Sequence, residues 1–311
     1  MVMIDLYGVP LDLGSERMGA DMGPNGLRYQ KFIQNLQSSG LQINDLGNLS
    51  CPSPEESERG DHTAKYLEPI VNTCTTLAKK AEESTRKGNQ VLVLGGDHSL
   101  AIGSIAGIAQ GLPGSLGVIW IDAHGDLNTP QTTPSGNVHG MPFAAILGYG
   151  HEKLTAISTR KPMVNVENAV GIGFKDLDPG ETAFVKEKGL QTFFINDILA
   201  HGLGPVFSAI DSLATRVDHI WVSFDLDAID LQEAPGVGMP NKGGLTYREI
   251  HAICAYIGKH YSIAGLDLVE YNPVNDIDHK TAILATELTA RLFGKDYSRY
   301  SQYLNDHAIQ E

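Results

Sequence analysis

Three short stretches of the sequence gather aspartate and histidine in patterns that suit metal-dependent chemistry. They are "GGDHS" (95–99), "DAHGD" (122–126) and "SFDLD" (223–227). In each stretch the acidic and imidazole side chains follow an apolar run, which places them where a buried strand ends. Carboxylate oxygens and imidazole nitrogens are common ligands of divalent metal ions in proteins.

The spacing explains how one strand end can present several ligands. Side chains on a strand alternate between its two faces, so residues i and i+2 share a face. Asp122 and His124 therefore point together, and Asp126 follows if the extended geometry persists. Asp225 and Asp227 are related in the same way. Four aspartates this close repel one another and resist ionisation, which a divalent cation relieves.

The combined motifs predict a metal centre, although each motif alone also has a structural explanation. Asp97 or Ser99 can cap a helix, and aspartates often form turns. A ligand set rich in oxygen with some nitrogen favours manganese, with zinc, cobalt and iron as competitors. Six ligands suit two ions about 3.5–4 Å apart that share bridging carboxylates and a water. The six candidates are His98, Asp122, His124, Asp126, Asp225 and Asp227.

Strands that alternate with helices would position these motifs. Continuous apolar runs predict strands covered on both faces of a parallel sheet. The predicted strands are 3–9, 90–96, 116–123, 169–174, 192–196, 219–227 and 262–270, and the predicted helices are 61–89, 245–260 and 279–294. No linker or repeat divides the chain, so we expect one α/β domain over residues 1–311 with a largely parallel central sheet.

Composition and charge exclude several kinds of binding partner and argue against a membrane location. The net charge of −14 argues against binding to nucleic acid or to an anionic membrane. The uncharged stretch 100–121 is interrupted by glycine and proline, which favours a short helix, a loop and a strand over a membrane span. Cys51, Cys74 and Cys254 form no C-x-x-C pair, and the N-terminus lacks the pattern of a secretory signal. We therefore expect a cytoplasmic protein.

Five motifs together resemble the ureohydrolases, and within them the arginases most closely. They are "GGDHS", "DAHGDLN", "SGNVHG", "SFDLDAID" and "GGLTYRE", within a likeness that extends from residues 8–28 to residues 268–273. The resemblance implies a three-layer α/β/α fold of the arginase/deacetylase type with two manganese ions per subunit. It assigns one ion to His98, Asp122, Asp126 and Asp225, and the other to Asp122, His124, Asp225 and Asp227.

The resemblance further implies hydrolysis of the guanidinium group of L-arginine to L-ornithine and urea by a hydroxide that bridges two manganese ions. Arginases hold the amino-acid end of the substrate with a loop like "NTPQTTPSGNVHG" (128–140). The residues that the resemblance assigns to this end are Asn128, Ser135 and Asn137 for the α-carboxylate and Asp178, with Glu181 and Asp176 through water, for the α-ammonium.

Three residues carry the predicted catalytic steps. A guanidinium is a poor electrophile, so its hydrolysis needs a strong nucleophile, which metal coordination of water supplies at neutral pH. Asp126 is expected to hydrogen-bond that nucleophile and pass its proton toward the leaving amine. By resemblance, Glu270 orients the guanidinium and His139 shuttles protons, although a histidine in a loop can also be purely structural.

Three departures from the family pattern and two alternative functions stay open at the sequence level. Met239 stands where ureohydrolases commonly have threonine, Leu231 where they often have proline, and Tyr271 where arginases often have valine. The alternatives are another ureohydrolase, such as an agmatinase or guanidino-acid hydrolase, and a non-catalytic binding protein with the same fold. The expected partners are a small-molecule substrate and further copies of the chain, as a trimer or hexamer.

Overall fold

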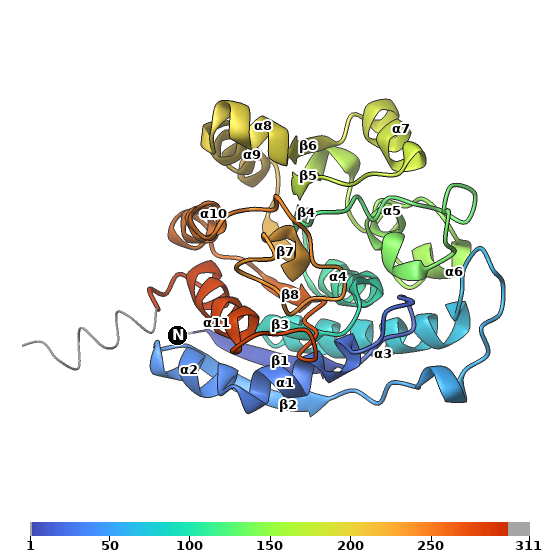
Figure 1. The fold of residues 1–311 in the computed structure, drawn as a ribbon, viewed down its shortest axis with the longest axis horizontal. Helices are drawn as coiled ribbons and strands as arrows, with labels where there is room; N and C mark the ends of the chain where they lie inside the picture. Colours follow the sequence, from blue (N-terminus) through green and yellow to red (C-terminus); the bar gives the residue numbers. More distant parts are fainter. Residues whose placement is uncertain (1, 298–311) are drawn as a thin grey trace, which may run out of the picture.

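Eight strands of the described chain join one sheet, and every neighbouring pair is parallel (Figure 1). The structure, a computed structural model, describes residues 2–297. The strands lie in the order β2-β1-β3-β8-β7-β4-β5-β6. They are β1 (Met3–Val9), β2 (Gln42–Asn48), β3 (Gln90–Gly95), β4 (Leu116–Ile121), β5 (Ala169–Phe174), β6 (Gln191–Phe194), β7 (His219–Asp225) and β8 (Gly265–Val269).

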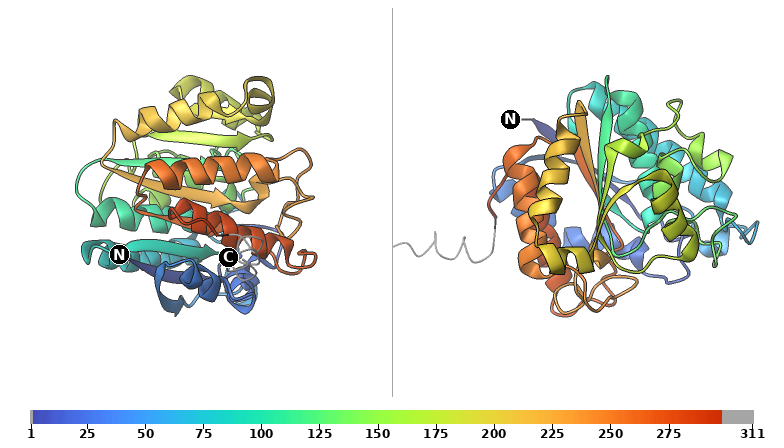
Figure 2. Two further views of the ribbon diagram at one scale, coloured as in Figure 1. Left: turned by 90° about the vertical axis from the view of Figure 1, so that its left-hand side faces the viewer. Right: turned by 90° about the horizontal axis from the view of Figure 1, so that it is seen from above.

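Helices cover both faces of the sheet and form two separate hydrophobic cores with it (Figures 1 and 2). One core takes side chains from α1 (Gly23–Tyr29), α2 (Phe32–Ser38), α8 (Ile195–His201), α9 (Gly204–Ala214), α10 (Tyr247–His260) and α11 (Lys280–Leu292). The other takes them from α3 (Leu67–Arg86), α4 (Ala101–Gly111), α5 (Pro142–Ile146), α6 (Glu152–Thr155) and α7 (Pro179–Lys188). The predicted three-layer α/β/α fold is confirmed.

Strand β4 shows why the central strands read as continuous apolar runs. Ile119 and Ile121 belong to one core, whereas Val118 and Trp120 belong to the other, and all four are fully buried. Neither face of the strand contacts water, so neither face needs polar residues. The same alternation fixes which side chains reach each helical layer.

The predicted elements differ from the observed ones mainly at their ends. The predicted helix 61–89 begins later, at Leu67, and ends at Arg86. The predicted strand 192–196 stops at Phe194, because Ile195 already begins α8. Strand β2 was not predicted, since its sequence "QINDLGN" is polar and mostly exposed at the edge of the sheet.

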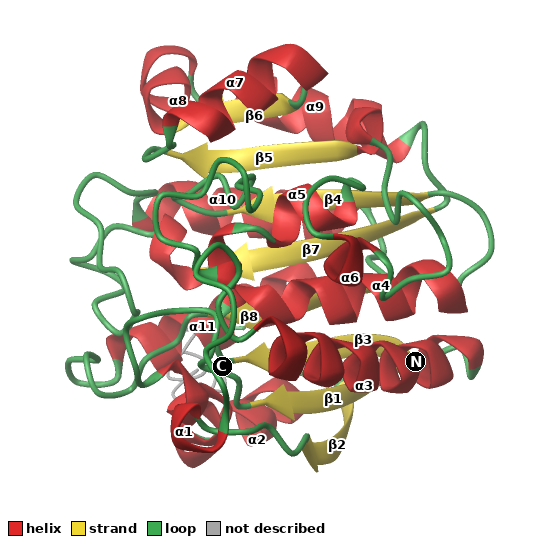
Figure 3. Cartoon of the chain, turned by 90° about the vertical axis from the view of Figure 1, so that its right-hand side faces the viewer, coloured by secondary structure: helices red, strands yellow, loops and turns green. Residues whose placement is uncertain are grey.

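The uncharged stretch 100–121 folds as predicted into a helix, a loop and a strand. It contains α4 and β4, and the turn between them includes Pro113 and Gly114. Within residues 2–297, the structure has no helix long and apolar enough to cross a membrane. The strands are all parallel, and the arrows of β1, β3, β5 and β7 point to one side in Figure 3, so the loops that follow β3, β4, β7 and β8 leave from the same edge of the sheet.

Candidate active site

The four central strands bring the predicted ligands together. Strands β3, β8, β7 and β4 are consecutive in the sheet, so the residues that end them are neighbours. His98 follows β3, Asp122 follows β4, and Asp225 ends β7. Glu270 follows β8. This is the carboxyl edge of the sheet, where ligands bind in open parallel α/β folds.

Two groups of potential ligands share one aspartate. In the first group, His98 Nδ1 lies 3.1 Å from Asp122 Oδ2 and 3.4 Å from Asp225 Oδ2. In the second, His124 Nδ1 lies 3.5 Å from Asp122 Oδ1 and 3.0 Å from Asp227 Oδ2. Within each group the ligand atoms all lie within 4.8 Å of one another. Asp122 belongs to both groups, with a different oxygen near each histidine.

Tight turns, rather than continued strands, gather the remaining carboxylates. Asp126 has a φ of 51°, so the extended geometry that the sequence argument allowed does not persist beyond β4. Its Oδ2 nevertheless lies 3.0 Å from His98 Nδ1. Asp227 lies in a 3₁₀ turn after β7, where its backbone N–H donates to Asp225 Oδ1 at 2.7 Å. The predicted strand 219–227 therefore ends two residues early, and the condition set for Asp126 is not met, although the side chains still meet.

The electrostatics of this cluster oppose its negative charge. Burial raises the pKa of Asp126 to about 7, and the neighbouring Asp122 carboxylate adds to the effect. Burial and the adjacent aspartates also raise the pKa values of Asp225 and Asp227. Burial likewise acts to raise the pKa of Asp122, but the imidazoles of His124 and His98 beside its oxygens hold it below its usual value. A bound cation would remove the repulsion among these carboxylates.

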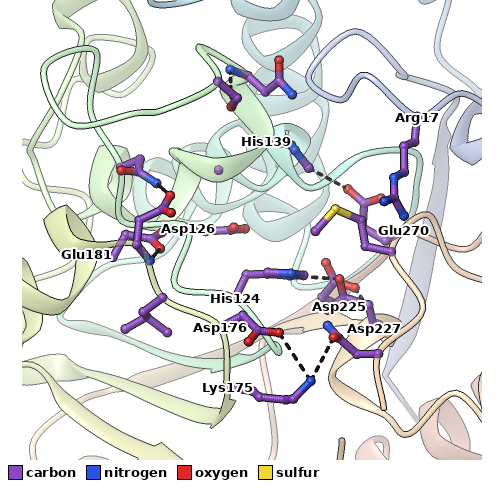
Figure 4. Close-up of a pocket in the computed structure, with 18 of the residues that line it drawn as sticks. Arg17, His124, Asp126, His139, Lys175, Asp176, Glu181, Asp225, Asp227 and Glu270 are labelled. Atoms are coloured by element: carbon purple, nitrogen blue, oxygen red, sulfur yellow. Dashed lines mark hydrogen bonds and ion pairs between the residues drawn. The ribbon is translucent and has the colours of Figure 1, made fainter. Parts of the chain in front are cut away.

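A pocket of about 650 Å³ opens above these groups (Figure 4). Its lining includes His124, Asp225 and Asp227, whereas His98 and Asp122 are almost completely buried. The lining also contains every residue predicted to act in catalysis or substrate binding: Asp126, His139, Glu270, Asn128, Ser135, Asn137, Asp178 and Glu181. The structure therefore places all the predicted catalytic and substrate-binding residues around one cavity.

Glu270 and His139 form an ion pair at the pocket wall (Figure 4). Glu270 Oε1 lies 3.5 Å from His139 Nδ1 and accepts the backbone N–H of His98 at 3.0 Å. Burial acts to lower the pKa of His139, but the hydrogen bond and the charge of Glu270 raise it to about 9. The contact with Glu270 therefore favours the protonated form of His139.

The loop predicted to bind the amino-acid end is fastened to helix α7. Asn128 Nδ2 donates to Asp178 Oδ2 at 2.8 Å. Glu181 accepts the backbone N–H of Asp178 at 2.8 Å in a capping box, and that of Leu127 at 3.0 Å. Burial raises the pKa of Glu181 to about 7. The two Glu181 oxygens thus accept hydrogen bonds from the backbone beside Asp178 and Asn128, which fixes these two residues at the pocket wall.

Comparisons with known proteins agree with this geometry. A model of the Arginase family matches residues 3–294. The chain belongs to the arginase family. It is 42% identical over 297 residues to the arginase of Bacillus caldovelox, and the alignment covers 95% of this chain and 99% of that protein. The solved structure of Bacillus caldovelox arginase superposes with a TM-score of 0.92 at 42% identity, covering 96% of this chain and 100% of that one. Entamoeba histolytica arginase in complex with L-ornithine gives a TM-score of 0.87 at 29% identity, covering 94% and 100%.

A metal site of the arginase family fits the hydrogen bonding of His98. The Ser223 hydroxyl donates to Asp267 Oδ1 at 2.5 Å, so its oxygen accepts from His98 Nε2 at 2.9 Å. The Nδ1 atom of this imidazole is buried and makes no hydrogen bond to any described residue, and three carboxylate oxygens lie within 3.4 Å of it. With Nε2 carrying the hydrogen, the Nδ1 lone pair faces these oxygens, which is the arrangement that a metal ion requires.

Only one of the three departures from the arginase pattern lies in the pocket lining. Met239 lines the pocket. Tyr271 is buried, and its hydroxyl donates to Asp276 Oδ2 at 3.0 Å. The backbone N–H of Leu231 donates to the Asn241 carbonyl at 2.9 Å within a turn. Met239 is therefore the departure that a substrate would meet.

The sequence argument missed several residues that support or line the site. Ser223 and Asp267 hold His98 from behind, and Ser223 is two residues before Asp225, on the same face of β7. A polar side chain inside an apolar strand was the available signal for both. Arg17 and Lys175 also line the pocket, and nothing in their local sequence marked them.

Proposed function

We propose that this chain hydrolyses the guanidinium group of L-arginine to L-ornithine and urea. The observation that carries the proposal is Asp122, which joins two ligand groups beneath a pocket lined by Glu270 and the 128–140 loop. The names of its relatives support it, since proteins 42% and 41% identical to this chain are arginases. The Entamoeba histolytica arginase structure that contains L-ornithine supports the product.

We also propose manganese as the metal. The first ion would be held by His98, Asp122, Asp126 and Asp225, and the second by Asp122, His124, Asp225 and Asp227. This ligand set offers mainly carboxylate oxygens, which suit manganese better than softer ions. When bound, the two ions would lower the pKa of water so that a nucleophile is available at neutral pH.

Three side chains of the pocket would then handle the guanidinium and the protons. Glu270 presents a carboxylate to the planar guanidinium, a pairing that fixes orientation as well as charge. Asp126 would accept the proton released by the attacking water with the oxygen that faces away from His98, and would pass it toward the departing amine. His139, whose pKa the hydrogen bond and charge of Glu270 raise, would donate a proton to the departing amine of L-ornithine.

The 128–140 loop would distinguish an amino acid from a simple amine. Ser135 Oγ accepts the backbone N–H of Asn137 at 3.1 Å, which leaves its hydroxyl hydrogen to donate to a carboxylate. The Asn128 and Asn137 amides supply further donors. Asp178 offers the opposite charge to the α-ammonium. Agmatine lacks the carboxylate and would leave these donors without a partner.

Urea release from L-arginine, agmatine and 4-guanidinobutyrate tests the proposal, with manganese added and the bound metal counted in the same sample. We expect kcat/KM to be highest for L-arginine and about two metal ions per chain. Equal or greater activity on agmatine would overturn the assignment of L-arginine. No urea from any guanidine, with metal content near zero, would favour a binding protein.

We further propose that the chain assembles as a homo-oligomer in the cytoplasm. Assembly into trimers or hexamers follows from the family resemblance. Light scattering on the eluate of a size-exclusion column measures the mass directly, and a mass near 33.5 kDa would show a monomer instead.

A further inference from the structure

Lys65 is a buried lysine that the proposed mechanism does not use. Its side chain precedes helix α3, and the residue is only 8% exposed. Its ammonium donates to Asn137 Oδ1 at 3.0 Å and contacts the Glu16 carboxylate. Lysines are rarely this buried unless their charge is paired and hydrogen-bonded. Here one partner is an acid and the other is a residue predicted to bind substrate.

The lysine determines which way the Asn137 amide points. An ammonium group only donates hydrogen bonds, so Asn137 must present its carbonyl oxygen, not its NH₂ group, to Lys65. The NH₂ group branches from the same carbon and is directed away from Lys65. No described protein group accepts a hydrogen bond from this Asn137 nitrogen. Asn137 is thus held as a donor.

Lys65 acts from outside the substrate pocket. Asn137 lines both that pocket and a second cavity of about 440 Å³. Lys65, Glu16 and Arg59 line the second cavity and do not line the first. Asn137 is therefore shared by the two cavities, and a ligand in the substrate pocket would contact its amide rather than Lys65.

The surrounding contacts fix the position of Lys65 relative to the 128–140 loop. The Lys65 backbone N–H donates to the Gly136 carbonyl at 2.9 Å. Gly136 has a φ of 76°, and a β-carbon there would lie 1.8 Å from the His62 carbonyl oxygen. Glu16 also pairs with Arg59 at 3.0 Å. The segment before α3 is therefore packed directly against the loop that carries Asn137.

We infer that Lys65 is a positioning residue for substrate selection: it orients the Asn137 amide toward the α-carboxylate of an amino-acid substrate. The inference rests on the proposed function. Lys65 polarises the Asn137 amide and strengthens the hydrogen bond that its NH₂ group donates. A substrate without a carboxylate gains nothing from this arrangement.

The first test is Lys65→Met, which keeps the apolar stem and removes the ammonium. We expect KM for L-arginine to rise about five- to tenfold with kcat within about twofold of the wild-type value, as loss of one charge-assisted hydrogen bond predicts. Lys153→Met is the matched control, because Lys153 also pairs with a glutamate but is 53% exposed on α6. Its KM should not change.

A double-mutant cycle with Asn137→Ala tests whether Lys65 acts through Asn137. Once the amide is gone, Lys65→Met should raise KM further by less than about twofold. Thermal unfolding shows whether Lys65→Met is folded. If it is not, Lys65→Gln takes its place. Gln can still donate a hydrogen bond to Asn137 but carries no charge, so its KM should lie between those of the wild type and of Lys65→Met.

Two results would overturn the inference while the proposed function stands: an unchanged KM for Lys65→Met, or full additivity in the cycle. A fall in kcat without a rise in KM would also contradict it. Absence of urea from L-arginine with the wild-type protein would instead overturn the proposed function itself, and the inference with it.

Discussion

Asp126 combines two features that rarely coincide in one carboxylate. Its backbone is left-handed and its Oδ2 lies 3.0 Å from His98 Nδ1, and burial raises its pKa. The first feature suits a metal ligand, and the second suits an acceptor of protons near neutral pH. We therefore assign both roles to the same side chain, one to each oxygen.

Asp126→Asn should separate these two roles. The amide oxygen can still approach the first ion, but it cannot accept a proton, so kcat should fall about 100-fold or more. Metal content should fall only in part, because His98, Asp122 and Asp225 remain. Activity and bound manganese are measured on the same preparation. Full activity at full metal content would contradict the assignment of Asp126.

Asn137→Ala should alter substrate preference more than turnover. The variant removes a donor to the α-carboxylate, so we expect KM for L-arginine to rise about tenfold and KM for agmatine to stay within about twofold. Asn128→Ala should have a broader effect, since Asn128 also holds Asp178 at 2.8 Å. Steady-state kinetics on both substrates decide, and an equal rise for both with Asn137→Ala would show that the loop does not read the carboxylate.

At the scale of the elements, the sequence predicts strands and ligand motifs well but not how they are ordered. Apolar runs located seven of the eight strands, because buried strands need no polar residues. The order β3-β8-β7-β4 depends on long-range pairing that no local pattern encodes. Only this order places Glu270 beside His98, at 3.0 Å. Likewise, the sequence gives no sign of the positive φ angles of Asp126 and Glu270, because glycine, the residue that usually adopts them, is absent at these positions.

The support behind the site escaped prediction for a related reason. Lys65 and Asp267 act through partners 72 and 44 residues away, Asn137 and Ser223. Local spacing identifies residues that share one strand or helix, whereas these contacts join separate elements. Their only mark in the sequence is a charge close to apolar residues, which a solvent-exposed position would explain equally well.

The packing of α4 on α3 gives a prediction about stability at this scale. A β-carbon on Gly107 would lie 2.4 Å from the Ala78 carbonyl oxygen and 2.6 Å from the Ala81 β-carbon. Gly107→Ala should therefore destabilise the protein by about 1–3 kcal/mol, because the backbone of α3 must move. Gly204→Ala is the control, since nothing lies within 4 Å of its added carbon. It should be neutral or stabilising by a few tenths of a kcal/mol.

Urea unfolding of both glycine variants, at one fixed manganese concentration, measures the difference. We expect the urea midpoint of Gly204→Ala to equal or slightly exceed that of the wild type, and the midpoint of Gly107→Ala to be lower than both. A Gly107→Ala midpoint at or above the wild-type value would show that the two helices separate more easily than their contacts indicate.

At the scale of the whole molecule, the site concentrates negative charge in a chain whose net charge is already −14. Without metal, rising pH should weaken the fold. Asp126, Asp225 and Asp227 have pKa values raised above the ordinary value, so the folded state holds protons that the unfolded state has lost. The pKa values of His98 and His124 are raised as well. Both effects stabilise the folded state at low pH, and the gain disappears as pH rises through the folded pKa values.

Metal binding should reverse this dependence, which gives the last prediction. Manganese must displace protons from the carboxylates and imidazoles, so its affinity increases with pH. Excess manganese should therefore raise Tm over an EDTA-treated sample by about 5–10 °C at pH 8 and by less than half of that at pH 6. Asp225→Asn, which removes the charge of a proposed ligand of both ions, should shrink the difference at pH 8. A metal-dependent shift in Tm that stays constant or narrows from pH 6 to pH 8 would contradict binding at this site, because the raised pKa values of its carboxylates and imidazoles require the metal to displace protons there.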